Sequence, residues 1–198
     1  MKLRKYLWEL AKIFRKGNIV RIKPTMRCNL SCPYCSVNKA HGRAPEFIEL
    51  HYYHWVRIIK GNEPVKMVVI SGGEPGLYDC VNLLINWCVA RGYLVQVITN
   101  LTNISKFRRI YKSWRVIFLS TYHPVGSLER YLMNYNELSR KFYITVRELR
   151  PADDMLPQHI PWAQVKAISD SQDETPMKIY APDGSVHDSC QALDRAGE

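Results

Sequence analysis

The sequence predicts an α/β protein with a parallel sheet, folded as a partial (β/α)6 barrel of the TIM type. Short apolar runs rich in Val and Ile alternate with helix-length amphipathic segments, as in successive strand–helix units. Five such units occupy about 130 residues, which is too few for a closed barrel of eight strands. The chain has 198 residues and 46% of them are hydrophobic, so a single domain can bury its own core.

The expected strands and helices follow one another in alternation. We expect strands at residues 18–23, 65–70, 93–98, 116–119 and 142–146. We expect helices at residues 47–60, 78–90, 104–112 and 128–140, where apolar residues recur at helical spacing. Gly92 gives a stop signal just after the second of these helices.

Both ends of the chain differ from the core of residues 18–150. Residues 1–17 predict a basic amphipathic helix that either packs under the barrel or contacts nucleic acid or anionic lipid. Residues 151–198 form an acidic C-terminal extension in which prolines interrupt regular structure. Within it we expect a sixth strand at residues 177–180, and a turn at Asp183 and Gly184. The extension either closes the open edge of the barrel or caps its site.

Charge is distributed unevenly along the chain. Residues 1–150 carry 25 basic and 9 acidic side chains, a net charge of +16, whereas residues 151–198 carry a net charge of −6. A core this basic attracts nucleic acid, an anionic surface or a nucleotide-like substrate, unless it is only a solvated basic surface. We find no apolar run of about 18 residues and no secretory signal, so we expect a cytoplasmic protein without a membrane span.

Three of the six cysteines lie within eight residues, which favours a metal or cluster site of reduced thiols over a disulfide framework. Cys28, Cys32 and Cys35 have the spacing C-x3-C-x2-C. Three thiolates on one short loop can ligate three irons of a cubane and leave the fourth iron open to a ligand. The alternative is a zinc site, whose fourth ligand would come from His41, Cys80, Cys88 or Cys190.

This cysteine motif, with an aromatic residue directly before its last cysteine, resembles the signature of the radical S-adenosylmethionine (SAM) superfamily. The resemblance implies that the three cysteines hold a [4Fe-4S] cluster whose open iron binds the amino and carboxylate groups of SAM. It also implies that one electron, from a donor such as flavodoxin or ferredoxin, cleaves SAM to methionine and a 5′-deoxyadenosyl radical. That radical then abstracts hydrogen from a substrate.

The segment from Ser71 to Pro75 follows the second expected strand and resembles the GGE-P motif of the same superfamily. The resemblance implies SAM contacts at Tyr34, Gly72, Gly73, Glu74, Pro75, Asn100 and Ser120. Three further residues near strand ends are substrate-binding candidates: His123, Arg147 and Glu148. Most of these positions follow the carboxyl ends of strands, the functional edge of α/β barrels. Two of these residues also have a purely structural interpretation. Asn100 would then cap a turn, and Arg147 would form a surface ion pair.

The other cysteines have simpler interpretations. Cys80 and Cys88 fall on one expected helix, and we expect them to pack in the core. Cys190 alone cannot hold a second cluster, so we expect no auxiliary cluster.

The sequence leaves the substrate open. The basic core favours a nucleobase or nucleoside, free or within DNA or RNA. One alternative is a small-molecule enzyme resembling 7-carboxy-7-deazaguanine synthase, and another is an activase for a glycyl-radical enzyme. Peptide modification is also open. The non-enzymatic alternative is an iron–sulfur or zinc binding module.

Overall fold

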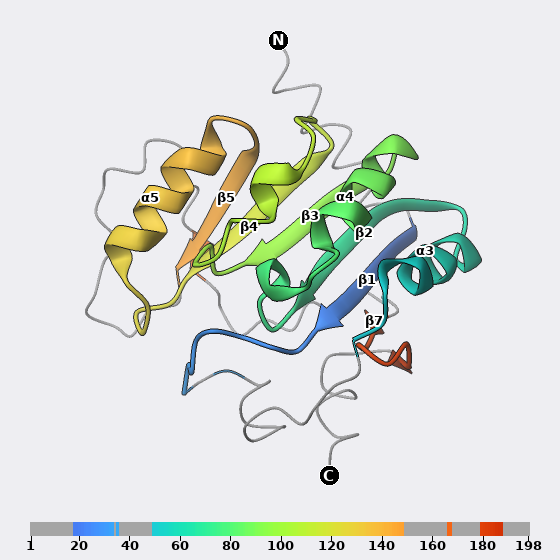
Figure 1. Ribbon diagram of the computed structural model, residues 1–198, viewed down its shortest axis with the longest axis horizontal. Coiled ribbons are helices and arrows are strands. Elements are labelled where there is room, and N and C mark those ends of the chain that lie inside the picture. Colours follow the sequence, from blue (N-terminus) through green and yellow to red (C-terminus); the bar gives the residue numbers. More distant parts are fainter. Residues whose placement is uncertain (1–17, 34, 36–48, 149–165, 168–178, 188–198) are drawn as a thin grey trace.

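The structure is a computed structural model that describes residues 18–33, 35, 49–148, 166–167 and 179–187. The expected N-terminal helix, Tyr34, His41 and Cys190 lie outside the described residues, as does most of the acidic extension. The described chain forms one eight-stranded sheet with helices against it (Figure 1).

Seven of the eight strands run parallel. They are β1 (Asn18–Thr25), β2 (Val65–Gly72), β3 (Leu94–Thr99), β4 (Val116–Tyr122), β5 (Tyr143–Glu148), β6 (Lys166–Ala167) and β7 (Ile179–Tyr180), and β8 (Val186–His187) pairs antiparallel with β7. The order across the sheet is β6-β5-β4-β3-β2-β1-β7-β8. Within the described residues the sheet is not closed, which confirms the α/β class and the partial parallel barrel.

The strand expected at residues 177–180 is β7, and it pairs with β1 at the side of the sheet away from β5. The turn expected at Asp183 and Gly184 follows it. Gly184 has a φ of +85° and its N–H donates to the Ala181 carbonyl at 2.9 Å, as a turn residue does. Parts of the acidic extension therefore lengthen the sheet.

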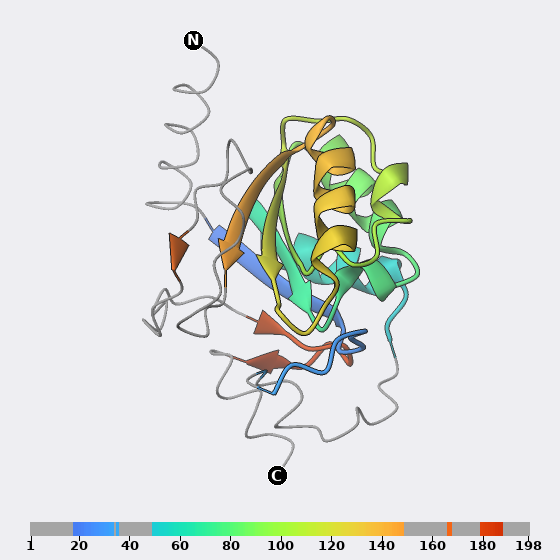
Figure 2. The ribbon, with the colours of Figure 1, turned by 90° about the vertical axis from the view of Figure 1, so that its left-hand side faces the viewer.

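The described residues include three α-helices, which lie on one face of the sheet, and Figure 2 shows all of them on the same side. They are α3 (Tyr52–Gly61), α4 (Val81–Ala90) and α5 (Leu128–Ser139), accompanied by the short 3-10 helices η1 (Pro75–Leu77) and η2 (Phe107–Arg109). Within the described residues, no helix is long and apolar enough to cross a membrane.

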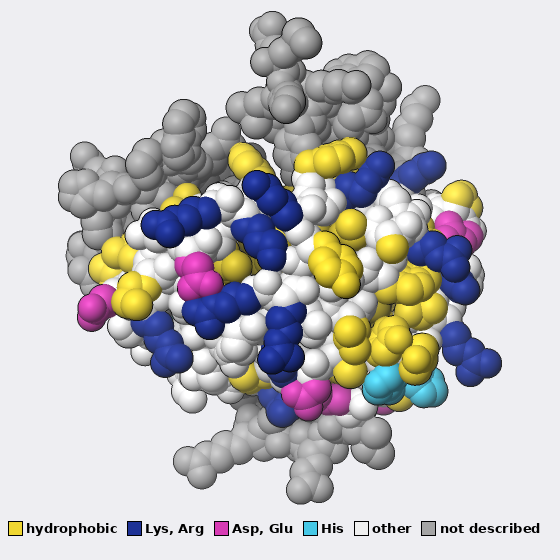
Figure 3. Space-filling view, turned by 45° about the horizontal axis from the view of Figure 1, so that its top comes forward, with side chains coloured by type: hydrophobic (Ala, Val, Ile, Leu, Met, Phe, Trp, Pro, Cys, Tyr) yellow, Lys and Arg dark blue, Asp and Glu magenta, His cyan; other side chains and the backbone are white. Residues whose placement is uncertain are grey.

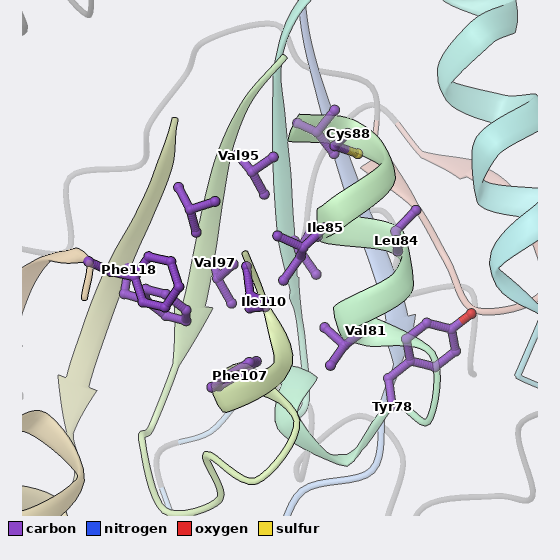
Figure 4. Close-up of a cluster of buried hydrophobic side chains, with 14 of the residues drawn as sticks. Tyr78, Val81, Leu84, Ile85, Cys88, Val95, Val97, Phe107, Ile110 and Phe118 are labelled. Carbon is purple, nitrogen blue, oxygen red and sulfur yellow. The ribbon is translucent and has the colours of Figure 1, made fainter. Parts of the chain in front are cut away.

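The main hydrophobic core fills the space between these helices and the sheet. In Figure 4, Val81 and Ile85 of α4 point toward Val95 and Val97 of β3. Cys88 is fully buried in the same core, and its burial raises the pKa of its thiol. Its expected place in the core is thereby confirmed. Cys80, half-buried, packs against this core.

The opposite face of the sheet carries a smaller apolar cluster. Side chains alternate along a strand, so Val68 and Ile70 of β2 join the main core while Met67 and Val69 lie on the other face. Leu94 of β3 completes this second cluster. The two faces thus have separate cores, and the polar strand ends lie beyond them.

The expected helix at residues 104–112 is wrong. Only η2 is helical there, and the chain then runs extended. Asn86 of α4 explains the difference, because its side chain accepts from the Tyr111 N–H at 2.8 Å and donates to the Arg109 carbonyl at 3.2 Å. These bonds occupy backbone groups that a helix would have used.

Two other helices begin later than expected. α3 begins at Tyr52, because Glu49 before it is bound by the Arg27 side chain and Leu50 accepts a hydrogen bond from the Tyr78 hydroxyl. α4 begins at Val81, after the separate turn of η1.

Basic side chains are spread over the helix-covered surface, as Figure 3 shows. Lys60, Arg91, Lys112 and Arg140 are exposed, and each stands in a segment that leads into a strand. These positions lie toward the edge of the sheet opposite to the one where the parallel strands end. These four basic residues therefore lie away from the strand ends, whereas Arg27, which is also exposed, follows the end of β1.

Candidate active site

The cysteine loop follows the end of β1. Cys32 is buried, whereas Cys28 and Cys35 are half-buried. The Cys35 N–H donates to the Cys32 carbonyl at 3.1 Å, which makes a tight turn between the last two cysteines. Burial is the main cause that raises the pKa of the Cys28 thiol, and the nearby Cys35 and Cys32 raise it further. The three cysteines thus share one short loop after β1.

Two loops beyond the strands contact these sulfurs. The Asn100 side-chain amide, after β3, donates to Cys28 Sγ at 3.8 Å. His123 Nδ1, after β4, lies 3.4 Å from Cys32 Sγ. Burial lowers the pKa of His123, which favours the neutral ring. The structure thus brings the expected residues Asn100 and His123 to the cysteine loop.

Glu74 connects the turn after β2 to the end of β3. Its carboxylate is fully buried and accepts from the Gly76 N–H at 2.8 Å, the Thr99 hydroxyl at 2.7 Å and the Asn100 N–H at 2.7 Å. Burial raises the pKa of Glu74 to about 7, against the opposing effect of these three donors. Because the carboxylate is engaged by the protein itself, its side chain acts as a positioning group for the turn.

Gly72 and Gly73 allow this turn to pack against the cysteine loop. A Cβ on Gly72 would lie 2.2 Å from the Thr25 carbonyl oxygen, and one on Gly73 would lie 2.2 Å from the Arg27 carbonyl oxygen. Gly72 also has a φ of +122°, a conformation that side chains disfavour. Backbone bonds join the same segments, with the Glu74 N–H donating to the Arg27 carbonyl at 2.7 Å. These glycines therefore make room for the protein's own backbone.

A polar network that the sequence reasoning missed lies beside the first cysteine. Asn29 donates to the Thr102 hydroxyl at 2.6 Å and accepts from the Asn100 amide at 3.2 Å. The Thr102 N–H in turn donates to Asn100 Oδ1 at 2.9 Å. The sequence feature that could have revealed this network is the run of polar residues directly after β3. Such a run is unlike the apolar strands that precede it.

Three expected site residues lie in different surroundings. Ser120 is fully buried, and its hydroxyl lies 2.6 Å from the Tyr131 hydroxyl of α5. Its side chain is therefore on the helix side of the sheet. Arg147 is half-buried near the end of β5, and Glu148 is the last residue of that strand. Pro75 begins η1 and is buried.

The donor set fits a cubane cluster better than a single ion. Within the described residues, no three His, Cys, Asp or Glu side chains converge closely enough to hold one metal ion. A cubane takes each thiolate on a different iron, so its ligands stand further apart. Three soft thiols on one loop, with polar side chains against two of them, are consistent with that geometry.

Comparison with known proteins gives a consistent result. A family model of the radical SAM superfamily matches residues 22–142. The chain is 37% identical over 90 residues to a probable GTP 3′,8-cyclase of Methanopyrus kandleri, covering 43% of this chain and 27% of that protein. It is 36% identical over 73 residues to the GTP 3′,8-cyclase of Aliarcobacter butzleri, covering 36% of this chain and 23% of that protein. The chain thus spans about a quarter of the length of these curated relatives.

Solved structures give the same fold. The Streptococcus suis protein SuiB, bound to the precursor peptide SuiA, superimposes with a TM-score of 0.55 at 22% identity, over 74% of this chain and 37% of that chain. The SAM-bound form of SuiB gives the same TM-score and identity, over 74% of this chain and 38% of that chain.

Proposed function

The chain belongs to the radical SAM superfamily, and we propose that it is a member that acts on a nucleotide or nucleoside. It is accordingly an enzyme, with a [4Fe-4S] cluster and SAM as its cofactors. The observation that carries the substrate proposal is that both curated relatives are named GTP 3′,8-cyclases. The likeness to SuiB, at 22% identity, supports the fold alone.

In this proposal Cys28, Cys32 and Cys35 hold the cluster. Bound together, the cluster and SAM supply a 5′-deoxyadenosyl radical that removes a hydrogen atom from the substrate. The protein's own residues fix the geometry. Asn100 orients the Cys28 sulfur and His123 orients the Cys32 sulfur through the contacts described above.

SAM would lie against the turn after β2 and the end of β3. Backbone groups of Gly72, Gly73 and Pro75 would face it, with Glu74 fixing the turn from beneath. Asn100 would lie beside it. Tyr34 would contribute backbone groups. Ser120 would also contribute only backbone groups, because its hydroxyl is already bound to Tyr131.

The substrate would approach from the strand ends on the far side of the sheet from the helices. Arg147 is on that side, since it alternates with Ile144 and Val146 of the main core. We also propose His123 and Glu148 as substrate contacts near the same strand ends. We further propose that the enzyme works in the cytoplasm with a flavodoxin- or ferredoxin-type electron donor.

The test is anaerobic turnover of the reconstituted enzyme with dithionite, SAM and a panel of ribonucleotides and nucleosides deuterated in the sugar. Mass spectrometry should find 5′-deoxyadenosine that carries deuterium, together with an altered nucleotide. Cys32→Ala serves as the control for adventitious cleavage. Deuterium transfer only from a deazaguanine precursor, a glycyl-radical partner or a peptide would replace this proposal by the matching alternative.

A substrate within DNA or RNA has weaker support. Lys60, Arg91, Lys112 and Arg140 lie toward the opposite edge of the sheet, so a polymer bound to them would not enter the strand ends. We therefore expect oligonucleotides to bind in a strongly salt-dependent way without raising turnover. Faster 5′-deoxyadenosine formation with an oligonucleotide than with its free nucleotides would favour the polymer substrate.

A further inference from the structure

Lys23 is a largely buried lysine for which the described residues provide no carboxylate partner. It is only 6% exposed, near the end of β1. Among the described residues, the ion pairs are Arg27 with Glu49, Lys106 with Asp79 and Arg108 with Glu137, and none includes Lys23. A lysine at such a largely buried position usually has an anionic partner.

Ser71 of β2 is a second unsatisfied polar group at the same place. Its hydroxyl oxygen is buried and has no hydrogen-bond partner within the described part of the chain. Ile22 of β1 pairs with Ile70 of β2, and Thr25 pairs with Gly72, so Ser71 stands opposite the Lys23–Pro24 bulge. Bulges near active sites commonly redirect a side chain.

Ser71 points to the face of the sheet away from the helices, because it follows Ile70 of the main core along β2. Lys23 stands in the bulge opposite Ser71, where the alternation of β1 is interrupted, so its neighbours give its place. Lys23 Cβ lies 3.5 Å from the position that a Cβ on Gly72 would take, which places it next to the proposed SAM turn. The apolar cluster of Met67, Val69 and Leu94 lies further along the same face.

We propose that Lys23 and Ser71 together bind a phosphate group of the substrate. An ammonium and a hydroxyl are both donors, so their shared ligand is an anionic oxygen acceptor. The sulfonium and amino groups of SAM are positive and are disfavoured beside Lys23. The carboxylate of SAM has the same chemistry as the phosphate, and the experiment separates the two. Assigning the phosphate to a nucleotide rests on the proposed function.

The test measures binding to the anaerobically reconstituted enzyme by equilibrium dialysis with inorganic pyrophosphate, GMP, guanosine and SAM. The variants are Lys23→Met and Ser71→Ala, and Lys66→Met of β2 is the control because that lysine is exposed. We expect Lys23→Met to weaken pyrophosphate and GMP binding about ten- to a hundred-fold, as for a charge-assisted hydrogen bond. Ser71→Ala should weaken both about two- to ten-fold. Guanosine and SAM affinities should not change.

The outcomes separate the competing explanations. Equal pyrophosphate affinity in Lys23→Met and wild type, or no binding to wild type at millimolar concentration, would overturn the site. A selective loss of SAM affinity would assign Lys23 to the cofactor carboxylate and also overturn it. If pyrophosphate binding responds as expected while neither GMP nor guanosine binds better than pyrophosphate, the site stands and the nucleotide proposal fails.

Thermal unfolding checks that a loss of binding is not a loss of folding. Lys23→Met keeps a side chain of similar length and adds no polar group at a largely buried position, so its melting temperature should equal or exceed that of wild type. A lower melting temperature together with unchanged pyrophosphate affinity would show that Lys23 serves the fold alone.

Discussion

Replacing Glu74 by glutamine tests the buried connection between the turn after β2 and the end of β3. The side chain is fully buried, and burial raises the pKa of the carboxyl from 4.5 to about 7. The unfolded carboxyl therefore loses its proton at a lower pH than the folded one. Between these two values the unfolded state binds fewer protons, so the free energy of unfolding falls as the pH rises.

The size of the effect follows from the two pKa values. A difference from 4.5 to about 7 corresponds to about 3 kcal/mol. This contribution is fully present below pH 4.5 and is lost progressively up to about pH 7. Glutamine does not titrate, so Glu74→Gln should lack this loss. The free energy of unfolding of the variant, minus that of wild type, should therefore rise by about 3 kcal/mol between pH 4.5 and about pH 7.

The assay is urea unfolding of the cluster-free proteins under reducing conditions, followed by circular dichroism at several pH values between 4 and 8. Only the difference between variant and wild type matters, because the other titrating groups are shared. The control is Glu137→Gln, whose exposed carboxylate has a pKa lowered by Arg108. For that control, the stability difference from wild type should change with pH only at the acid end, where the wild type loses the contribution of the ion pair as the pH falls. Parallel curves for Glu74→Gln and wild type would refute the reasoning.

Three further substitutions test the site directly. Cys32→Ala should abolish the visible absorbance of the reconstituted cluster, and retained absorbance would remove this cysteine from the ligand set. Gly73→Ala should destabilise the apoprotein by about 1–3 kcal/mol, because the new Cβ meets the Arg27 carbonyl, and it should lower the iron content after reconstitution. The matched control is Gly61→Ala, since no atom lies within 4 Å of the added Cβ there. Ser120→Ala should leave SAM affinity unchanged in equilibrium dialysis, whereas a ten-fold loss would show that its hydroxyl turns to the cofactor.

The strands and the two motifs were predictable because each has a local cause. Buried parallel strands appear as continuous apolar runs, and each of the first five expected strands overlaps an observed one. The cysteine spacing and the paired glycines are likewise local features. Knowing that Gly73 faces the Arg27 carbonyl required the fold, because the two residues are distant in sequence.

Other features could not be predicted because they depend on distant partners. Ile104, Phe107 and Ile110 recur every three residues as in a helix, but Asn86 holds the end of that segment extended. β4 continues to Tyr122, beyond the expected end at residue 119. Ser120 is therefore an internal strand residue whose side chain faces the helices.

The turn after β3 shows why Asn100 reaches the cysteine loop. Leu101 has a φ of +55°, which is unfavourable for a residue with a side chain, and persists only where neighbours fix the backbone. Here the Leu101 N–H donates to the Thr99 hydroxyl at 3.0 Å, and its carbonyl accepts from Asn134 of α5 at 2.6 Å. At the same turn, the Glu74 carboxylate accepts a hydrogen bond from the Asn100 N–H. The chain therefore turns sharply at the end of β3, and the Asn100 side chain is directed to Cys28 rather than along the strand.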